Sequence, residues 1–198
     1  MDKLGLSYIH TVHNRGERKA SDINRLSVVT KKREDEIFEQ NLGNTLDSQT
    51  EKNEGKLLFF HKIKDKLGQE DYLQISNATY RKKIAQLRLS AHKLEIEVGR
   101  HKNIVRNNRF CMYCRTGEIE TEEHFLFGCP NYKREREMFL TELILHDDGY
   151  KGLADGIGLL NRIFSSKDHT VFILFGKYLT KCWEVRHSMC SNLPKTLL

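Results

Sequence analysis

Residues 109–130 read RFCMYCRTGEIETEEHFLFGCP, and this segment contains three of the five cysteines of the chain. Together with one histidine they form the pattern Cys111-x2-Cys114-x9-His124-x4-Cys129. Zinc accepts thiolate and imidazole ligands in a tetrahedron, and a closed Cys3His set leaves no open position for water. The pattern therefore predicts a structural zinc site, not a hydrolytic one. The alternative is three buried structural thiols and a surface histidine.

The residues between the ligands favour the turns that such a site needs. Gly117 permits a chain reversal after the first cysteine pair. Residues 109–114 alternate as in a strand, and Thr121 is a favoured first residue of a helix that would present His124. Four aromatic residues lie near the ligands, where we expect packing around the cluster more than stacking on a nucleobase: Phe110, Tyr113, Phe125 and Phe127.

On both sides of this segment, apolar residues recur at spacings of three and four. The longest stripe predicts one continuous helix that begins at Asn77 or Thr79 and ends at Gly99. Similar patterns predict helices at about 56–67, 131–145 and 168–188, and four glycines predict a loop over 147–158. Because so few residues between 100 and 130 are apolar, a metal would replace a missing core there.

These patterns predict a mainly α fold. We expect a helical domain over residues 55–190, with a small CCHC zinc-binding turn at 109–130 between its central helices. Residues 1–54 carry scattered aliphatic residues among many polar ones, which predicts a loosely ordered N-terminal arm with a short helix at about 31–40. Residues 191–198 are expected to form a tail.

Composition narrows the class of protein. The chain has 198 residues, of which 38% are hydrophobic and 30% charged, so the core is modest. The longest apolar run, Val171–Phe175, is far shorter than a membrane span, and the N-terminus has no stretch typical of a signal peptide. We therefore expect an intracellular protein, nuclear or cytoplasmic, with reduced thiols and no membrane contact. Cys182 and Cys190 are interpreted as core or free thiols.

Positive charge is concentrated around the predicted zinc turn. The net charge of the chain is +6, whereas residues 78–115 alone carry ten basic and two acidic residues. A stripe of this kind suits a phosphate backbone, although a solvated helix face is the simpler interpretation. The candidate nucleic-acid contacts are Arg81, Lys82, Lys83, Arg88, Arg100, Lys102, Arg106, Arg109 and Arg115.

Three stretches of the sequence resemble one known family. They are YRKKIAQLRLSAHKLEIEVGR (80–100), CMYC (111–114) and EEHFLFGCP (122–130). Together they resemble the C-terminal zinc-binding region of non-LTR (LINE-type) retrotransposon reverse transcriptases, over about residues 57–145. The cysteine, cysteine, histidine, cysteine pattern of the family falls on the four residues named above. In that family the region follows the polymerase palm, so the resemblance implies a part that holds template RNA or target DNA.

The catalytic parts of that family have no counterpart here. A polymerase needs paired aspartates for two metal ions, and Asp147-Asp148 lacks the aromatic residue of that box and follows the zinc turn. The glycines at 152, 156 and 158 precede no Lys-Ser/Thr pair, so they form no phosphate loop. We find no catalytic triad, and we interpret His92 as a hydrogen-bonded core residue. The chain looks like a detached tail without polymerase or nuclease activity.

Three hypotheses follow from the sequence. The first is a non-catalytic, zinc-binding module that binds nucleic acid, with RNA or DNA left open. The second is a protein-interaction module whose helices at 56–67 and 168–188 dock a separately encoded partner. The third is a degenerate transposon fragment without a selected role.

Overall fold

The computed structural model describes residues 58–64, 68, 70–153 and 156–191, together with Val28, Lys32 and Glu36, which are helical. The chain divides into two units, Met1–Ser48 and Gln49–Leu198, and nearly all described residues belong to the second. The predicted arm and tail lie outside the described residues, apart from those three positions and Ser191, so both stay predictions.

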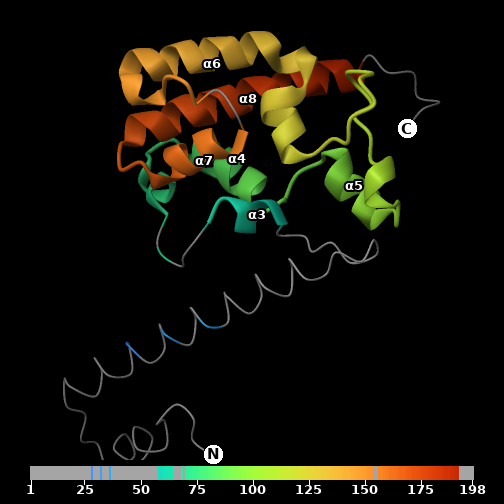
Figure 1. The fold of residues 1–198 in the computed structure, drawn as a ribbon, viewed down its shortest axis with the longest axis horizontal. Helices are drawn as coiled ribbons and strands as arrows, with labels where there is room; N and C mark the ends of the chain where they lie inside the picture. The colour runs from blue at the N-terminus through green and yellow to red at the C-terminus, as the bar shows by residue number, and fades with distance from the viewer. Residues whose placement is uncertain are drawn as a thin grey trace, which may run out of the picture. The chain divides into compact units, whose positions relative to one another are not determined.

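Helices make up most of the described part of Gln49–Leu198, which confirms the mainly α prediction (Figure 1). Its α-helices are α3 (Leu58–Lys62), α4 (Ala78–Arg88), α5 (Glu95–His101), α6 (Lys133–His146), α7 (Gly156–Ser165) and α8 (His169–Ser191). Short 3-10 turns are η1 (Asp71–Gln74), η2 (Arg106–Asn108), η4 (Pro130–Tyr132) and η5 (Asp148–Tyr150), and η3 (His124–Gly128) is a π-helical turn. No strand occurs among the residues described, only an isolated bridge between Phe110 and Ile119. None of the described helices has both the length and the apolar character to cross a bilayer.

The core is built around α8, which packs against α4 and α6. The helices α6 and α8 lie side by side and run in opposite directions, as the colours in Figure 1 show. Phe139 of α6 stacks on Tyr178 of α8, with ring centroids 4.7 Å apart. Phe175 and Leu179 of α8 are fully buried. This helix was predicted at about 168–188, and the structure confirms it with three more residues at its end.

The prediction of one long helix that ends at Gly99 is wrong, because the structure has two helices there. The first, α4, begins after Asn77, whose side chain caps it by accepting a hydrogen bond from the Tyr80 amide at 3.1 Å. It ends at Arg88, and Ser90 then takes a left-handed conformation with φ +48°. The Ser90 and Ala91 amides donate to the carbonyls of Leu87 and Gln86, which is a Schellman termination with serine in the usual glycine position.

Gly99 lies inside α5 and does not terminate it. A Cβ atom on Gly99 would sit 2.6 Å from Cγ of Arg109, so only glycine lets this side chain cross the helix. Arg109 then donates hydrogen bonds to the carbonyls of Ile96 (2.8 Å) and Ile104 (2.9 Å). The glycine therefore permits a close approach of the Arg109 side chain, which ties residues 109–130 to α5.

Two other helix predictions differ from the structure. The helix predicted at 56–67 is described only as α3, five residues long, which buries Phe59. The predicted loop over 147–158 contains the start of α7, which buries Leu159, Leu160 and Ile163. The sequence did not predict α7, because glycines occupy its first turn and its apolar residues begin only at Ile157.

Candidate metal centre

A short antiparallel hairpin presents the first two ligands. The Cys111 amide donates to the Glu118 carbonyl at 2.8 Å, and the Glu120 amide donates to the Arg109 carbonyl at 2.9 Å. Between Cys111 and Glu118 the chain reverses through Arg115 and Gly117, whose φ angles are +56° and +75°. The glycine is suited to this left-handed backbone, as the sequence predicted. The strand-like alternation expected at 109–114 is realised only as the bridge Phe110–Ile119.

A π-helical turn presents the other two ligands. The Thr121 hydroxyl accepts a hydrogen bond from the His124 amide at 3.0 Å, so the predicted capping role of Thr121 is confirmed. The Cys129 amide donates to the His124 carbonyl at 2.6 Å, which closes the wide turn η3. In a regular α-helix, residues five apart lie about 140° apart around the axis. The wider turn brings His124 and Cys129 toward the same side, and π turns of this kind are common at functional sites.

The four predicted ligands meet in space. One ligand atom from each of Cys111, Cys114, His124 and Cys129 lies within 4.8 Å of all the others. Cys114 Sγ is 3.4 Å from Nε2 of His124. Tetrahedral zinc, with bonds of about 2.0–2.3 Å, needs ligand atoms about 3.6–3.8 Å apart, so the cluster fits an ion after a small contraction. Three of the four residues are buried, and the cluster could hold a metal ion.

Glu118 orients the histidine ligand. Its Oε2 lies 2.6 Å from Nδ1 of His124, on the side of the ring away from the cysteines. With Nδ1 donating to this carboxylate, Nε2 is left as the metal-binding atom, which is the usual arrangement behind a histidine ligand. The contact with Cys111, and then that with Glu118, raises the pKa of His124 to about 9 against the opposing effect of burial.

The thiols already interact as a unit. The hydrogen bond with Cys129, followed by burial, raises the pKa of Cys111 to about 12. The same hydrogen bond lowers the pKa of Cys129. Without a metal, Cys129 is therefore the favoured thiolate and His124 carries a proton. A divalent ion would replace these protons, because zinc binds thiolates and neutral imidazole.

A buried ion pair fastens the hairpin to the helical core. Both carboxylate oxygens of Glu120 accept from Arg186 of α8, one of them at 3.0 Å. The same carboxylate accepts from the Glu95 amide at 2.7 Å, which holds the start of α5. Arg186 also lies over the Tyr113 ring, 4.4 Å from its centroid. Residues 109–130 are thus joined to two helices by one pair of charges.

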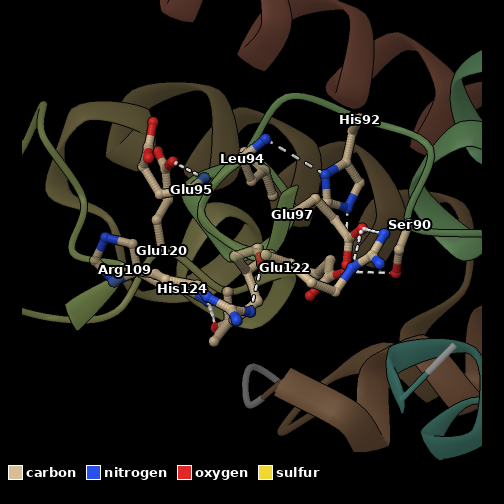
Figure 2. A network of polar contacts seen from close by, with 12 residues as sticks. Ser90, His92, Leu94, Glu95, Glu97, Arg109, Glu120, Glu122 and His124 are labelled. Carbon is tan, nitrogen blue, oxygen red and sulfur yellow. Dashed lines mark hydrogen bonds and ion pairs between the residues drawn. The ribbon is translucent and has the colours of Figure 1, made fainter. Parts of the chain in front are cut away.

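A second polar network lies beside the first (Figure 2). The Ser90 hydroxyl donates to Glu122 at 2.8 Å, and Nε2 of His92 lies 3.1 Å from the same oxygen. The Leu94 amide donates to Nδ1 of His92 at 3.4 Å, so both ring nitrogens are used. Burial alone would raise the pKa of Glu122, but the bonds from His92 and Ser90 outweigh it and lower that pKa. This network explains why Ser90 tolerates its left-handed backbone.

The basic residues expected to contact nucleic acid separate into three groups by their exposure. Lys82, Lys102 and Arg115 are exposed. Arg88 is only 1% exposed; it is paired with Glu70 and lies 4.2 Å from the Phe164 ring centroid. Arg88 is therefore a core residue, and we leave it out of the interface that we propose.

The remaining five basic residues are half-buried and have internal contacts. Arg81 donates to the Ser76 carbonyl at 3.0 Å, and Lys83 lies 5.7 Å from the Trp183 ring centroid. Arg100 donates twice to Glu97, and Arg109 bonds to the carbonyls described above. Arg106 is also half-buried and makes contacts. Part of the basic stripe is thus used inside the fold.

The sequence pointed to the ligands but not to the residues that support them. Ser90 looked like an ordinary position in a long helix, and Glu118, Glu120 and Glu122 looked like local acidity. Their signal was the spacing of two between the glutamates, which places carboxylates at alternate positions of the segment that joins the two ligand pairs. The partners of Ser90 and Glu120 lie 32 and 66 residues away in the chain, too far to be identified by any pattern.

Comparison of the chain with protein-family models, curated proteins and solved structures finds no match. The resemblance to the retrotransposon reverse transcriptases therefore rests on the quoted motifs alone.

Proposed function

We propose that the protein is a non-catalytic nucleic-acid-binding module whose Cys3His cluster holds one structural zinc ion. The observation that carries the proposal is the meeting of four ligand atoms within 4.8 Å. The motif resemblance supports the further proposal that the module is similar to the tail of a retrotransposon reverse transcriptase. A degenerate fragment of such an element is the alternative in which the same fold has no binding role.

The donor set favours zinc among the metals of the cell. Three cysteines and one histidine suit a borderline-soft ion in a tetrahedron, whereas magnesium and calcium require oxygen ligands. The carboxylate of Glu118 on the far side of His124 is typical of the support behind a zinc-bound histidine. Four protein ligands leave no position for a reacting water, so the ion would have a structural role.

The charge beside the cluster favours a polyanionic partner. Residues 98–117 contain five arginines and lysines and no acidic residue. Lys102 and Arg115 are exposed at the two ends of this stretch. Basic side chains of this kind bind phosphates and release counterions, which makes the affinity fall with salt.

The polar networks are arranged for structure. Ser90 donates to Glu122 and not to His92, so the histidine cannot act as a base on its hydroxyl. Ser90 and Glu122 are also buried. Ser90 and His92 therefore form no nucleophile–base pair in this geometry.

The test measures the affinity of the zinc-loaded full chain for labelled oligonucleotides between 50 and 200 mM salt. Over this range the Debye length falls from about 14 Å to about 7 Å. We expect a linear decrease of log affinity with log salt, and the double variant Lys102→Gln/Arg115→Gln should reduce the slope by about 2. The control is Lys151→Gln, because Lys151 is exposed beyond the opposite end of α6, a helix about 21 Å long. Absence of any salt-dependent binding would contradict the proposal.

A protein-interaction module is the second candidate. The apolar faces predicted to dock a partner are used internally, since Phe59 of α3 and Phe175 of α8 are buried. A different groove, between α6 and α8, is lined by Met138, Leu174 and Tyr178. Met138 is 53% exposed, which is the observation that favours this candidate. Substitution of Met138 by glutamate would abolish partner binding there and leave nucleic-acid binding unchanged.

A further inference from the structure

The structure separates the four aromatic residues of the zinc segment by their surroundings. Phe125 is fully buried, with its ring centroid 4.7 Å from that of Trp183. Tyr113 lies against Arg186, and its hydroxyl is 3.4 Å from Cys190 Sγ. Phe127 packs against the core. Phe110 differs from these three, because 46% of its surface is exposed.

The hairpin geometry explains the exposure of Phe110. Its neighbours Arg109 and Cys111 face inward, toward α5 and the metal cluster respectively. Successive side chains of an extended segment point to opposite faces, so Phe110 faces outward. The hydrogen bonds on either side make Phe110 and Ile119 a non-hydrogen-bonded pair, whose side chains lie close together on that outer face. The ring is therefore supported on one side and open to solvent on the other.

Basic residues precede and follow Phe110 in the sequence. Phe110 lies within the acid-free stretch 98–117, between Lys102 and Arg115, which are both exposed. Met112, which is 44% exposed, extends the apolar surface on the turn that follows. An exposed aromatic ring, with exposed basic residues before and after it in the sequence, matches the two components of single-strand binding, a face for stacking and charges for the backbone.

We propose that Phe110 stacks on a base of single-stranded nucleic acid, whose phosphates contact Lys102 and Arg115. This inference rests on the proposed function and specifies its ligand. A duplex offers no free base face along its length, because each base is covered by its neighbours, whereas a single strand offers one at every nucleotide. The zinc ion holds the turn that presents the ring, so the stacking face is fixed before the strand binds.

The experiment compares a labelled single strand with a duplex of the same sequence, using zinc-loaded full chains and direct titration. Phe110→Ala is expected to weaken single-strand binding about 5- to 150-fold, the range measured for loss of one stacked base, and duplex binding less than about 2-fold. Phe110→Leu keeps an apolar side chain without a π face and should lose as much. Phe110→Trp should bind the single strand as tightly as the wild type does. Binding should quench its indole fluorescence more than it quenches the fluorescence of the wild type, whose one tryptophan is Trp183. The matched control is Leu145→Ala, because Leu145 is 80% exposed at the far end of α6.

The outcomes distinguish this inference from the proposed function. If Phe110→Ala or Phe110→Leu binds the single strand as tightly as the wild type does, the stacking role is overturned. The proposed nucleic-acid-binding function would still stand. An equal loss on single strand and duplex would also overturn it. If the wild type binds neither ligand at low salt, the proposed function fails and the inference fails with it. The zinc content and the melting temperature of each variant are measured as well, to check that the fold is retained.

Discussion

The helical core and residues 109–130, which carry the Cys3His cluster, differ in what stabilises them. The core of α4, α6 and α8 buries side chains such as Phe175 and Leu179, and the burial of apolar surface stabilises it. Residues 109–130 instead place four metal ligands and three glutamates on a hairpin and one π turn. The two regions should therefore differ in how strongly they depend on the metal. Loss of the metal should disorder the segment and spare the core of α4, α6 and α8. Loss of packing in that core should lower the stability of both regions, because Phe125 of the segment packs against Trp183 of α8.

The largest effect is expected from removal of a zinc ligand. Cys129→Ser should lose the ion, and structural zinc contributes about 10–16 kcal/mol of apparent binding free energy in zinc-finger peptides. Hydrogen exchange of the amides of residues 109–130 should then increase at least about 100-fold, while exchange in α8 changes little. The matched control is Cys182→Ser, because Cys182 is a fully buried cysteine of α8 outside the cluster. That variant should keep its zinc and the protection of the segment.

The opposite substitution tests the core. Phe175→Ala removes a fully buried ring that contacts Phe139 and Phe164, and we expect it to lower the free energy of unfolding by about 3–5 kcal/mol. Denaturant unfolding measures this loss. The zinc content at low denaturant should stay equal to that of the wild type. A chain that loses zinc through this substitution would show that the two regions are one cooperative unit.

A smaller effect is expected behind the histidine ligand. Glu118→Gln keeps the size of the side chain and removes the charge opposite Nδ1 of His124. Metal affinity should fall about 10- to 100-fold, the usual cost of losing such a partner. Competition with a chromophoric chelator measures the affinity. The control is Glu123→Gln on the same segment, whose carboxylate pairs with Lys62 and not with a ligand. Equal losses in the two variants would contradict the role of Glu118.

The smallest effect concerns the start of α8, far from the ligands in sequence. The hydrogen bond with His146, followed by that from the Thr170 amide, lowers the pKa of Asp168 below its usual value of 3.8. Because the folded pKa is the lower one, this carboxylate stabilises the fold above pH 3.8 and the effect is lost as the pH falls through the folded value. Asp168→Asn should cost less than about 1 kcal/mol near pH 6, since the site is exposed. Its melting temperature should approach that of the wild type as the pH falls progressively below 3.8, and a difference that stays constant with pH would contradict this role of Asp168.

The sequence predicted features that depend on short-range patterns. The ligand set, the turn at Gly117, the Thr121 cap and the helix α8 all follow from residue types a few positions apart. All four are present in the structure. The mainly α class follows for the same reason, because helical periodicity is a local signal.

The failures depend on contacts between distant residues. The break after Arg88 is stabilised by the Ser90 hydroxyl on Glu122, 32 residues later in the chain. Gly99 was interpreted as a helix end because glycine is common there, yet it makes room for Arg109. Arg88 was predicted to contact nucleic acid, yet its side chain pairs with Glu70 inside the fold. None of these pairs has a signal in the sequence around either residue.

Native mass spectrometry, with and without a chelator, measures directly whether the Cys3His cluster holds an ion. We expect one zinc ion per chain in the wild type and in Cys182→Ser, removable by chelation, and none in Cys129→Ser. A wild-type chain that is metal-free and still protects the amides of residues 109–130 from exchange would contradict this expectation.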